Sequence, residues 1–286
     1  MDDQARGRTL TAPDDDALIP DGLDATLVLV RHGESTLIAE GRFQGRADSP
    51  LTEIGRRQAG LVAVRLAAPR AAPVLPVPTG PPVEIVHSPL GRATETAHAI
   101  DLAMRDVGWS VTTRPDDGFP EIGQGDWQGL HRDEIAVRYA AELAAWRRTP
   151  LEVWAPGGEA LPEVEARVRP SLARILATLA EGRAPGTLDR SQVSGYGDPA
   201  AVHPWSVVVG HDGVFKIVLL TLFGLELERY WMWSMDLCAV TVVEFRAGRP
   251  VLRAHNLTAH LAALDVDREA AAHKAEAEER ERSGAQ

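Results

Sequence analysis

The chain has 286 residues, of which 44% are hydrophobic and 25% are charged, a composition typical of globular proteins. No apolar run reaches the roughly 18 residues that a membrane-spanning helix requires, so we expect no membrane partner. The formal net charge is -11 and no basic stripe is visible along the sequence, so we expect no nucleic-acid partner.

The acidic charge is concentrated at the two ends of the chain. Residues 1–24 contain seven Asp and two Arg, and residues 265–286 contain seven acidic and four basic residues. Neither segment has the apolar periodicity that packing requires. We therefore predict a disordered acidic arm over 1–24, a folded domain over 25–264 and a charged tail over 265–286.

Cysteine content and the start of the chain bear on location. Cys238 is the single cysteine, so an intrachain disulfide is excluded. The first residues, Met1 to Gln4, lack the basic and apolar regions of a secretion signal. We expect a cytoplasmic protein. The sequence leaves open whether it forms a homodimer.

Apolar strand patterns and helical patterns alternate along the chain. The expected strands are 25–30, 83–86, 111–113, 206–209, 238–245 and 250–254, and the expected helices are 53–68, 91–106, 130–148, 161–181 and 214–223. Such alternation predicts an α/β fold with a largely parallel central sheet flanked by helices. The six prolines of 69–82 predict a stiff surface connection, and the Gly and Pro of 182–204 predict a flexible insertion.

Chemically active side chains follow two of the expected buried strands. Arg31, His32 and Gly33 come directly after Leu27 to Val30, and the segment from Gly210 to Gly213 repeats a histidine beside a glycine after the second strand. Parallel strands bind ligands at their carboxyl ends, so the two histidines meet there if the strands are neighbours. With Arg31 and with Arg92 at a helix start, the residues predict a pocket for a phosphoryl group.

Two other chemistries compete with this interpretation. His32, His211, Asp212 and Glu121 are permissible metal ligands, but the two arginines disfavour a nearby cation and no metal-ligand spacing motif occurs. A serine hydrolase is disfavoured because residues 33–35 lack the Gly-x-Ser-x-Gly pattern. We therefore expect neither a metal nor an organic cofactor.

Five ordered motifs resemble the histidine phosphatase superfamily, also called the phosphoglycerate-mutase-like family. They are Arg31-His32-Gly33-Glu34-Ser35, the helix start Leu51 to Ala59, Ser88-Pro89-Leu90-Gly91-Arg92-Ala93, the loop Glu121 to Gly129, and Gly210-His211-Asp212-Gly213. The ending Asn256 to Leu261 is also similar, and the resemblance spans about residues 25–262. It implies a three-layer sandwich and a phosphatase-type member of the family.

The resemblance assigns roles to matched positions. His32 would be the nucleophile and carry the phosphoryl group on its ring. Arg31, Arg92 and His211 would bind the phosphoryl oxygens. Glu121 would protonate the leaving oxygen and then activate water, a role that calls for a raised carboxyl pKa.

Further matched positions are expected to contact phosphate or substrate. They are Gly33, Ser35, Gln44 and Asp212. Two positions depart from the family pattern: Ile38 stands where Asn is common, and Asp212 stands where Gly is usual. Glu34 and Glu159 are other carboxylates that sequence alone leaves open as the acid. Specificity residues are expected among Ile38, Phe43, Phe119, Trp127 and the segment 145–160.

The predicted function is a metal-independent phosphomonoesterase acting on a small phosphorylated metabolite through phosphohistidine. One alternative is phosphoglycerate mutase-type transfer, which requires extra cations around the pocket mouth. The loop after Glu121 offers none until Arg132, which favours water as the acceptor. A non-catalytic phosphate-binding module is the other alternative, and the complete set of motifs disfavours it.

Overall fold

The computed structural model describes residues 17–182 and 203–264. Its sheet has six strands in the order β3-β2-β4-β1-β5-β6. The strands are β1 (Ala25–Arg31), β2 (Glu84–His87), β3 (Thr112–Pro115), β4 (Trp205–Gly210), β5 (Val240–Arg246) and β6 (Arg249–Leu257). The first four pair in parallel, whereas β5 pairs antiparallel with both β1 and β6.

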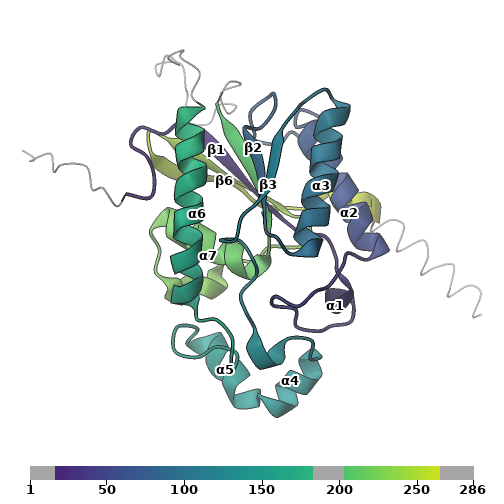
Figure 1. Ribbon diagram of the computed structural model, residues 1–286, viewed down its shortest axis with the longest axis vertical. Helices are drawn as coiled ribbons and strands as arrows, with labels where there is room; N and C mark the ends of the chain where they lie inside the picture. The colour runs from purple at the N-terminus through teal and green to yellow at the C-terminus, as the bar shows by residue number, and fades with distance from the viewer. Residues whose placement is uncertain (1–16, 183–202, 265–286) are drawn as a thin grey trace, which may run out of the picture.

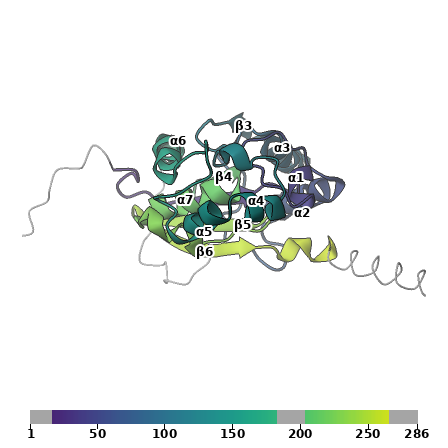
Figure 2. The same cartoon turned by 90° about the horizontal axis from the view of Figure 1, so that it is seen from below.

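Helices cover both faces of this sheet (Figures 1 and 2). They are α1 (Thr36–Ala39), α2 (Glu53–Ala67), α3 (Gly91–Asp106), α4 (Arg132–Arg138), α5 (Ala140–Arg148), α6 (Leu161–Glu181) and α7 (Asp212–Phe223), with 3-10 turns η1 (Gly125–Trp127), η3 (Leu227–Met232) and η4 (Ala259–Leu261). Figure 1 shows α6 and α7 on one side, α2 and α3 on the other, and α4 with α5 at the lower end. The predicted three-layer α/β sandwich with a largely parallel sheet is confirmed.

Alternating side chains of the central strand belong to two separate cores. Leu27 and Leu29 of β1 pack with α6 and α7, whereas Val28 and Val30 pack with α2 and α3. All four are fully buried. A strand buried on both faces reads as a continuous apolar run because each face has its own helical layer.

Local signals place the helices that lead to the sheet's carboxyl end. The Thr52 side chain accepts a hydrogen bond of 3.0 Å from Gly55 N and caps α2, as the sequence indicates. Six apolar residues at helical spacing along α6 are all buried, namely Val164, Val168, Leu172, Ile175, Leu176 and Leu179. Helix α7 ends at Gly224, whose φ of 60° is the left-handed conformation that favours glycine.

Three expectations differ from the structure. The segment expected as one helix over 130–148 is two helices, with a break at Tyr139. The end of the expected arm is packed: Leu23 is buried and Leu18 lies against the core beside it. The proline-rich connection is not wholly on the surface, because Leu75 and Val77 fill the α2–α3 core.

The last two differences have the same origin: isolated apolar residues pack into a core that no local pattern predicts. Residues 1–16, 183–202 and 265–286, which hold the rest of the arm, most of the insertion and the tail, lie outside the described residues. In the part of the chain that is described, no helix has both the length and the apolarity to span a membrane.

Candidate active site

The two histidines lie side by side because their strands are neighbours. In the parallel pair of β1 and β4, Arg31 is in register with Gly210. His32 N continues the ladder with a 3.0 Å hydrogen bond to Gly210 O. The ring centroids of His32 and His211 are 5.0 Å apart, and both side chains are buried. The predicted meeting of the two strand ends therefore occurs.

The tautomer of His32 is set by its own backbone. Its Nδ1 lies 2.6 Å from Gly33 O, and a carbonyl only accepts, so Nδ1 carries the proton. The lone pair is therefore on Nε2. Burial, and then the charges of Arg31 and Arg92, hold the pKa of His32 well below 6.5. The ring is neutral near pH 7 and has a nucleophilic nitrogen.

A pair of glycines brings helix α2 against the loop that follows His32. A Cβ at Gly33 would lie 2.4 Å from Gly55 O, and a Cβ at Gly55 would lie 1.9 Å from Glu34 O. Gly33 N also donates to Thr96 Oγ1 of α3 at 3.2 Å. Any side chain at either glycine would push α2 away and displace the loop after His32.

The two arginines present buried donors beside the histidines. Arg92 is 1% exposed and donates to Gly45 O at 2.7 Å and to Ala47 O at 3.1 Å. Burial lowers the pKa of Arg92 to about 10, which leaves the guanidinium charged at neutral pH. Arg31 donates through Nη1 to Met235 O.

Three buried nitrogens around His32 have no hydrogen-bond partner among the described residues. They are Nε of Arg31, Nε of Arg92 and Nδ1 of His211. His211 is held by its other nitrogen, Nε2, which lies 2.8 Å from Ser88 Oγ. Burial, followed by the charges of His32 and the arginines, lowers the pKa of His211 well below 6.5. Orphaned buried polar atoms are rare, and their grouping indicates an anion site.

Glu121 lies at the start of α7, next to His211. Its Oε1 accepts from Ile122 N at 2.9 Å and Val214 N at 3.1 Å, and its Oε2 accepts from Gly213 N at 3.2 Å. A Cβ at Gly213 would lie 2.6 Å from Glu121 Oε1, so only glycine leaves room for the carboxylate. The helix N-terminus favours the negative charge there.

Three side chains from distant segments hold the loop that carries Glu121, and we call Arg46, Glu159 and Arg167 the acid-loop clamp. Arg46 Nε and Arg167 Nη2 donate to Glu121 O at 3.1 and 3.3 Å. Glu159 pairs with both arginines at 2.8 Å and accepts from Gly123 N at 3.2 Å. Burial raises the pKa of Glu159, but the hydrogen bonds and charge of Arg167 outweigh it, and the net shift is downward.

The acid-loop clamp was missed by sequence reasoning. The loop itself carries no cation between Glu121 and Arg132, but Arg46 and Arg167 from other segments both reach the carbonyl of Glu121. Arg46 is 75 positions from Glu121 in the sequence, and Arg167 is 46 positions from it. No local sequence pattern identifies contacts over such separations. Glu159, left open as an alternative acid, is occupied by two arginines. Glu34, the other, accepts from Thr52 Oγ1 at 2.8 Å.

The remaining matched positions are placed as follows. Ser35 is buried and donates to Gln44 Oε1 at 2.6 Å. Asp212 pairs with Lys216 Nζ at 2.7 Å and accepts from Met235 N at 3.0 Å, so both of its oxygens have protein partners. Because Met235 O accepts from Arg31, Asp212 helps to position the segment that holds Arg31. Substrate contact by Ser35, Gln44, Asp212 and Gly33 stays a prediction.

The expected specificity residues divide between the surface and the core. Ile38 and Arg31 line a cavity of about 470 Å³, together with residues near the C-terminal end of the described chain. Phe119 is fully buried in the α6–α7 core, and Trp127 is 1% exposed in a small aromatic core under α4 and α5. Both aromatic side chains fill cores, so neither is placed to contact substrate. Their sequence context alone does not distinguish a core position from the rim of a substrate pocket.

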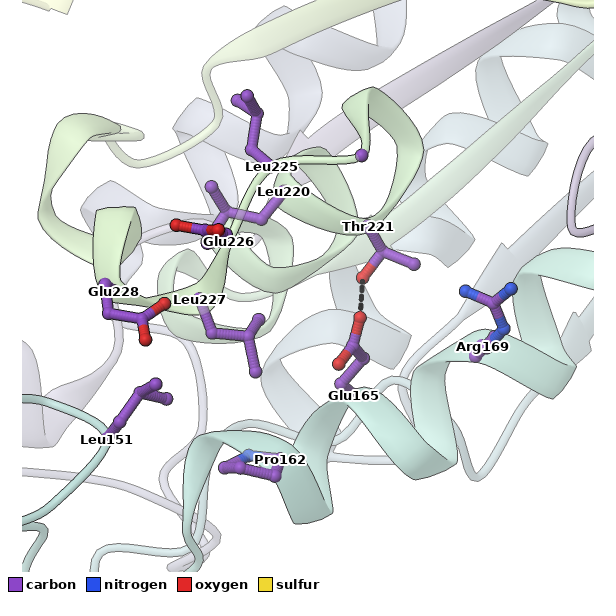
Figure 3. Close-up of a pocket in the computed structure, with 11 residues that line it drawn as sticks. Leu151, Pro162, Glu165, Arg169, Leu220, Thr221, Leu225, Glu226, Leu227 and Glu228 are labelled. Atoms are coloured by element: carbon purple, nitrogen blue, oxygen red, sulfur yellow. Dashed lines mark hydrogen bonds between the residues drawn. The ribbon is translucent and has the colours of Figure 1, made fainter.

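A second cavity, of about 410 Å³, lies at the opposite end of α7 from His211 (Figure 3). Its charged lining residues are Glu165, Glu226, Glu228 and Arg169. Thr221 of α7 bonds Glu165 of α6 across it at 3.3 Å. Three carboxylates against one guanidinium disfavour a phosphate in this cavity.

Comparison with known proteins adds an independent finding. The family model described as histidine phosphatase superfamily (branch 1) matches residues 27–185 and 195–258. The chain belongs to the histidine phosphatase superfamily. The family predicted from the five motifs is therefore confirmed.

Relatives within the superfamily are named phosphatases. The chain is 27% identical to phosphoserine phosphatase 1 of Hydrogenobacter thermophilus, over 87% of this chain and 98% of the relative. It is 31% identical to glucosyl-3-phosphoglycerate phosphatase of Mycolicibacterium vanbaalenii, over 71% of this chain and 76% of the relative. A mycobacterial glucosyl-3-phosphoglycerate phosphatase solved with inorganic phosphate has a TM-score of 0.65, with 27% identity over 82% of this chain and 99% of that one. The predicted class of enzyme, a phosphatase of small phosphorylated metabolites, is confirmed.

Proposed function

We propose that the protein hydrolyses phosphomonoesters through a phosphohistidine formed on Nε2 of His32. One observation carries the proposal: this nitrogen has the lone pair, and three orphaned buried nitrogens belong to His211, whose ring contacts His32, and to Arg31 and Arg92, whose charges act on it. Arg31, Arg92 and His211 would direct these nitrogens to the phosphoryl oxygens. The geometry matches what a dianionic phosphoryl group requires.

The first chemical step transfers the phosphoryl group to His32. Nε2 attacks phosphorus and forms the P–N bond as the P–O bond to the alcohol breaks. The electron pair of that bond goes to the leaving oxygen, which takes a proton from the Glu121 carboxyl group. The arginines stabilise the charge that spreads over the equatorial oxygens in the transition state.

The second step hydrolyses the phosphoenzyme. Water loses a proton to the Glu121 carboxylate and forms a P–O bond. The P–N bond breaks, and its electron pair returns to Nε2 of His32. Inorganic phosphate leaves, and Glu121 is again protonated for the next turnover. The backbone N–H groups at the start of α7 favour the carboxylate form of Glu121, which supports its role as the base of this second step.

The relatives' names support a substrate class and no single substrate. Phosphoserine and glucosyl-3-phosphoglycerate are both small phosphate esters of carboxylate-bearing alcohols. We propose a small phosphorylated metabolite and, because Cys238 is a lone buried thiol, a cytoplasmic location. A panel of phosphorylated metabolites assayed for released phosphate would rank the candidates.

Mutase-type transfer is the second candidate, and one observation favours it. Arg46 and Arg167 lie beside the acid loop, where a mutase would hold its bisphosphorylated intermediate. Glu159 pairs with both, which reduces the positive charge available to a second phosphate. We therefore expect water to remain the acceptor.

One experiment tests both parts of the proposal. The enzyme is mixed with 3-phosphoglycerate and a bisphosphoglycerate primer, and isomerisation and free phosphate are followed together. Phosphate release faster than isomerisation is the expected result. Isomerisation far faster than phosphate release would overturn the hydrolase proposal.

A second experiment tests the phosphohistidine. Brief exposure to labelled substrate should leave acid-labile, base-stable label on the protein, and label on Ser, Thr or Asp would overturn the phosphohistidine.

A further inference from the structure

Tyr230 lies in η3 with its ring fixed on several sides. The side chain is 3% exposed. The rings of Trp231 and Trp146 lie 4.8 and 6.3 Å from it between centroids, and Lys216 Nζ lies 5.1 Å from its centroid. Lys216 is itself buried and paired with Asp212. A ring held in this way has one position for its hydroxyl group.

That hydroxyl points to the same small space as the Glu121 carboxylate. A Cβ built on Gly213 would lie 2.6 Å from Glu121 Oε1 and 3.0 Å from Tyr230 Oη. Tyr230 Oη has no hydrogen bond to any residue in 17–182 or 203–264. The residue is buried as a whole, but Oη is not among the buried atoms without a partner in the described residues, so this oxygen is accessible beside the acid and can bind a water molecule.

We propose that Tyr230 is a further catalytic residue, which holds the hydrolytic water together with Glu121. This inference rests on the proposed phosphohistidine mechanism. Burial, and then the charges of Glu121 and Asp212, raise the pKa of the Tyr230 hydroxyl well above its usual value. The phenol therefore keeps its proton throughout turnover, and Glu121 remains the only group of the two that exchanges one.

The geometry of two partners determines the direction of attack. The water donates one O–H to the Glu121 carboxylate and accepts the Tyr230 O–H through one of its two lone pairs. Its free lone pair is then directed to phosphorus. As the P–O bond forms, the first proton passes to Glu121, and the electron pair of the breaking P–N bond returns to His32. Tyr230 neither gains nor loses a proton in this step, so its contribution is to orient the attacking water.

The test separates the two chemical steps in Tyr230→Phe. With 4-nitrophenyl phosphate the leaving group needs no proton, so the burst of nitrophenolate reports phosphorylation of His32. Rapid-quench measurement of labelled phosphohistidine then reports its hydrolysis. We expect a burst rate within about twofold of wild type and hydrolysis slowed by about ten- to a hundredfold, with phosphoenzyme accumulating.

The matched control is Tyr139→Phe, which removes a hydroxyl from the neighbouring aromatic cluster, 6.2 Å from Trp127 between ring centroids. It should leave both rates unchanged. Both rates are normalised to the burst amplitude, so unfolded enzyme does not affect them. Hydrolysis at the wild-type rate in Tyr230→Phe overturns the inference, as does equal slowing of both steps. Absence of a burst and of phosphohistidine in wild-type enzyme would instead overturn the proposed function.

Discussion

The phosphate pocket and the acid loop are built in different ways. The pocket's two histidines follow neighbouring parallel strands, and the backbone ladder between β1 and β4 sets their spacing. The acid loop has no such ladder beneath it. Its place depends on the acid-loop clamp and on backbone N–H groups at the start of α7. The spacing of the histidines is therefore set by backbone pairing, whereas the position of the acid loop depends on side-chain contacts.

The two regions also differ in charge balance. In the pocket, Arg31 Nε, Arg92 Nε and His211 Nδ1 have no hydrogen-bond partner among the described residues, whereas each arginine of the acid-loop clamp is paired with Glu159. Buried unpaired donors cost stability and favour binding of an anion. The pocket is therefore arranged for its ligand, and the acid-loop clamp is arranged for the fold of its own loop.

The largest expected effect comes from the pocket. His32→Ala should reduce turnover by about 10⁴-fold or more, because it removes the nucleophile itself. The melting temperature should stay close to that of wild type, since the ladder of β1 and β4 is backbone. Turnover and labelled phosphoenzyme are measured on the same samples. Substantial labelling of His32→Ala would show that another residue carries the phosphoryl group.

The next effect tests the acid itself. Glu121→Gln should slow release of inorganic phosphate by about 10²–10⁴-fold, because an amide neither gives nor takes the proton. The loss should be smaller for the burst with 4-nitrophenyl phosphate, whose leaving group needs no acid. Steady-state and pre-steady-state rates with that ester and an alkyl phosphate provide the comparison. If Glu121→Gln slowed both chemical steps equally with both esters, the role of Glu121 as the acid would be contradicted.

A smaller effect is expected when the acid loop is loosened. Glu159→Gln should lower kcat by about ten- to a hundredfold through displacement of Glu121, with KM for substrate nearly unchanged. The matched control is Glu40→Gln, which breaks the exposed pair of Arg42 and Glu40 and should have no effect. Steady-state kinetics on both variants measure the difference. A rise in KM with kcat unchanged would indicate that the acid-loop clamp binds substrate directly.

The pH dependence sharpens the contrast in charge. The pKa of His32 and of His211 is lowered, so the acid limb of kcat/KM should lie below pH 6.5. The same shifts act on stability: the unfolded chain takes up protons below about 6.5 that the folded rings refuse, so the free energy of unfolding falls as pH decreases. Urea unfolding between pH 7 and 5 checks this sign. A free energy that rises over that interval would contradict it.

The smallest expected effect is on removal of metal ions. The pocket has its positive charge from Arg31 and Arg92, so a strong chelator should leave turnover unchanged. Vanadate, which mimics the five-coordinate transition state, should inhibit and should raise the melting temperature. Chelation followed by assay, with and without added Zn²⁺ or Mg²⁺, measures this. Loss of activity that either ion restores would favour the alternative of a metal site.

The strands and the pocket could be predicted because their signals are local. An apolar run predicts a strand with two buried faces, and a charged residue and a histidine directly after it are necessarily at the strand's end. Five short motifs in order were sufficient to predict the family, which the family model then confirmed. The break at Tyr139 and the burial of Leu23 and Leu75 were missed, because each depends on a core made by distant segments.

By itself, the sequence determined the family and the order of strands and helices, and it predicted His32, Arg31, Arg92, His211 and Glu121 as one set of site residues. Tertiary structure decided which nitrogen of His32 has the lone pair and that Glu159 pairs with Arg46 and Arg167. It also decided that Tyr230 meets Glu121 at Gly213. The physical reason is range: backbone patterns act over a few residues, whereas ion pairs and close contacts join side chains more than a hundred positions apart.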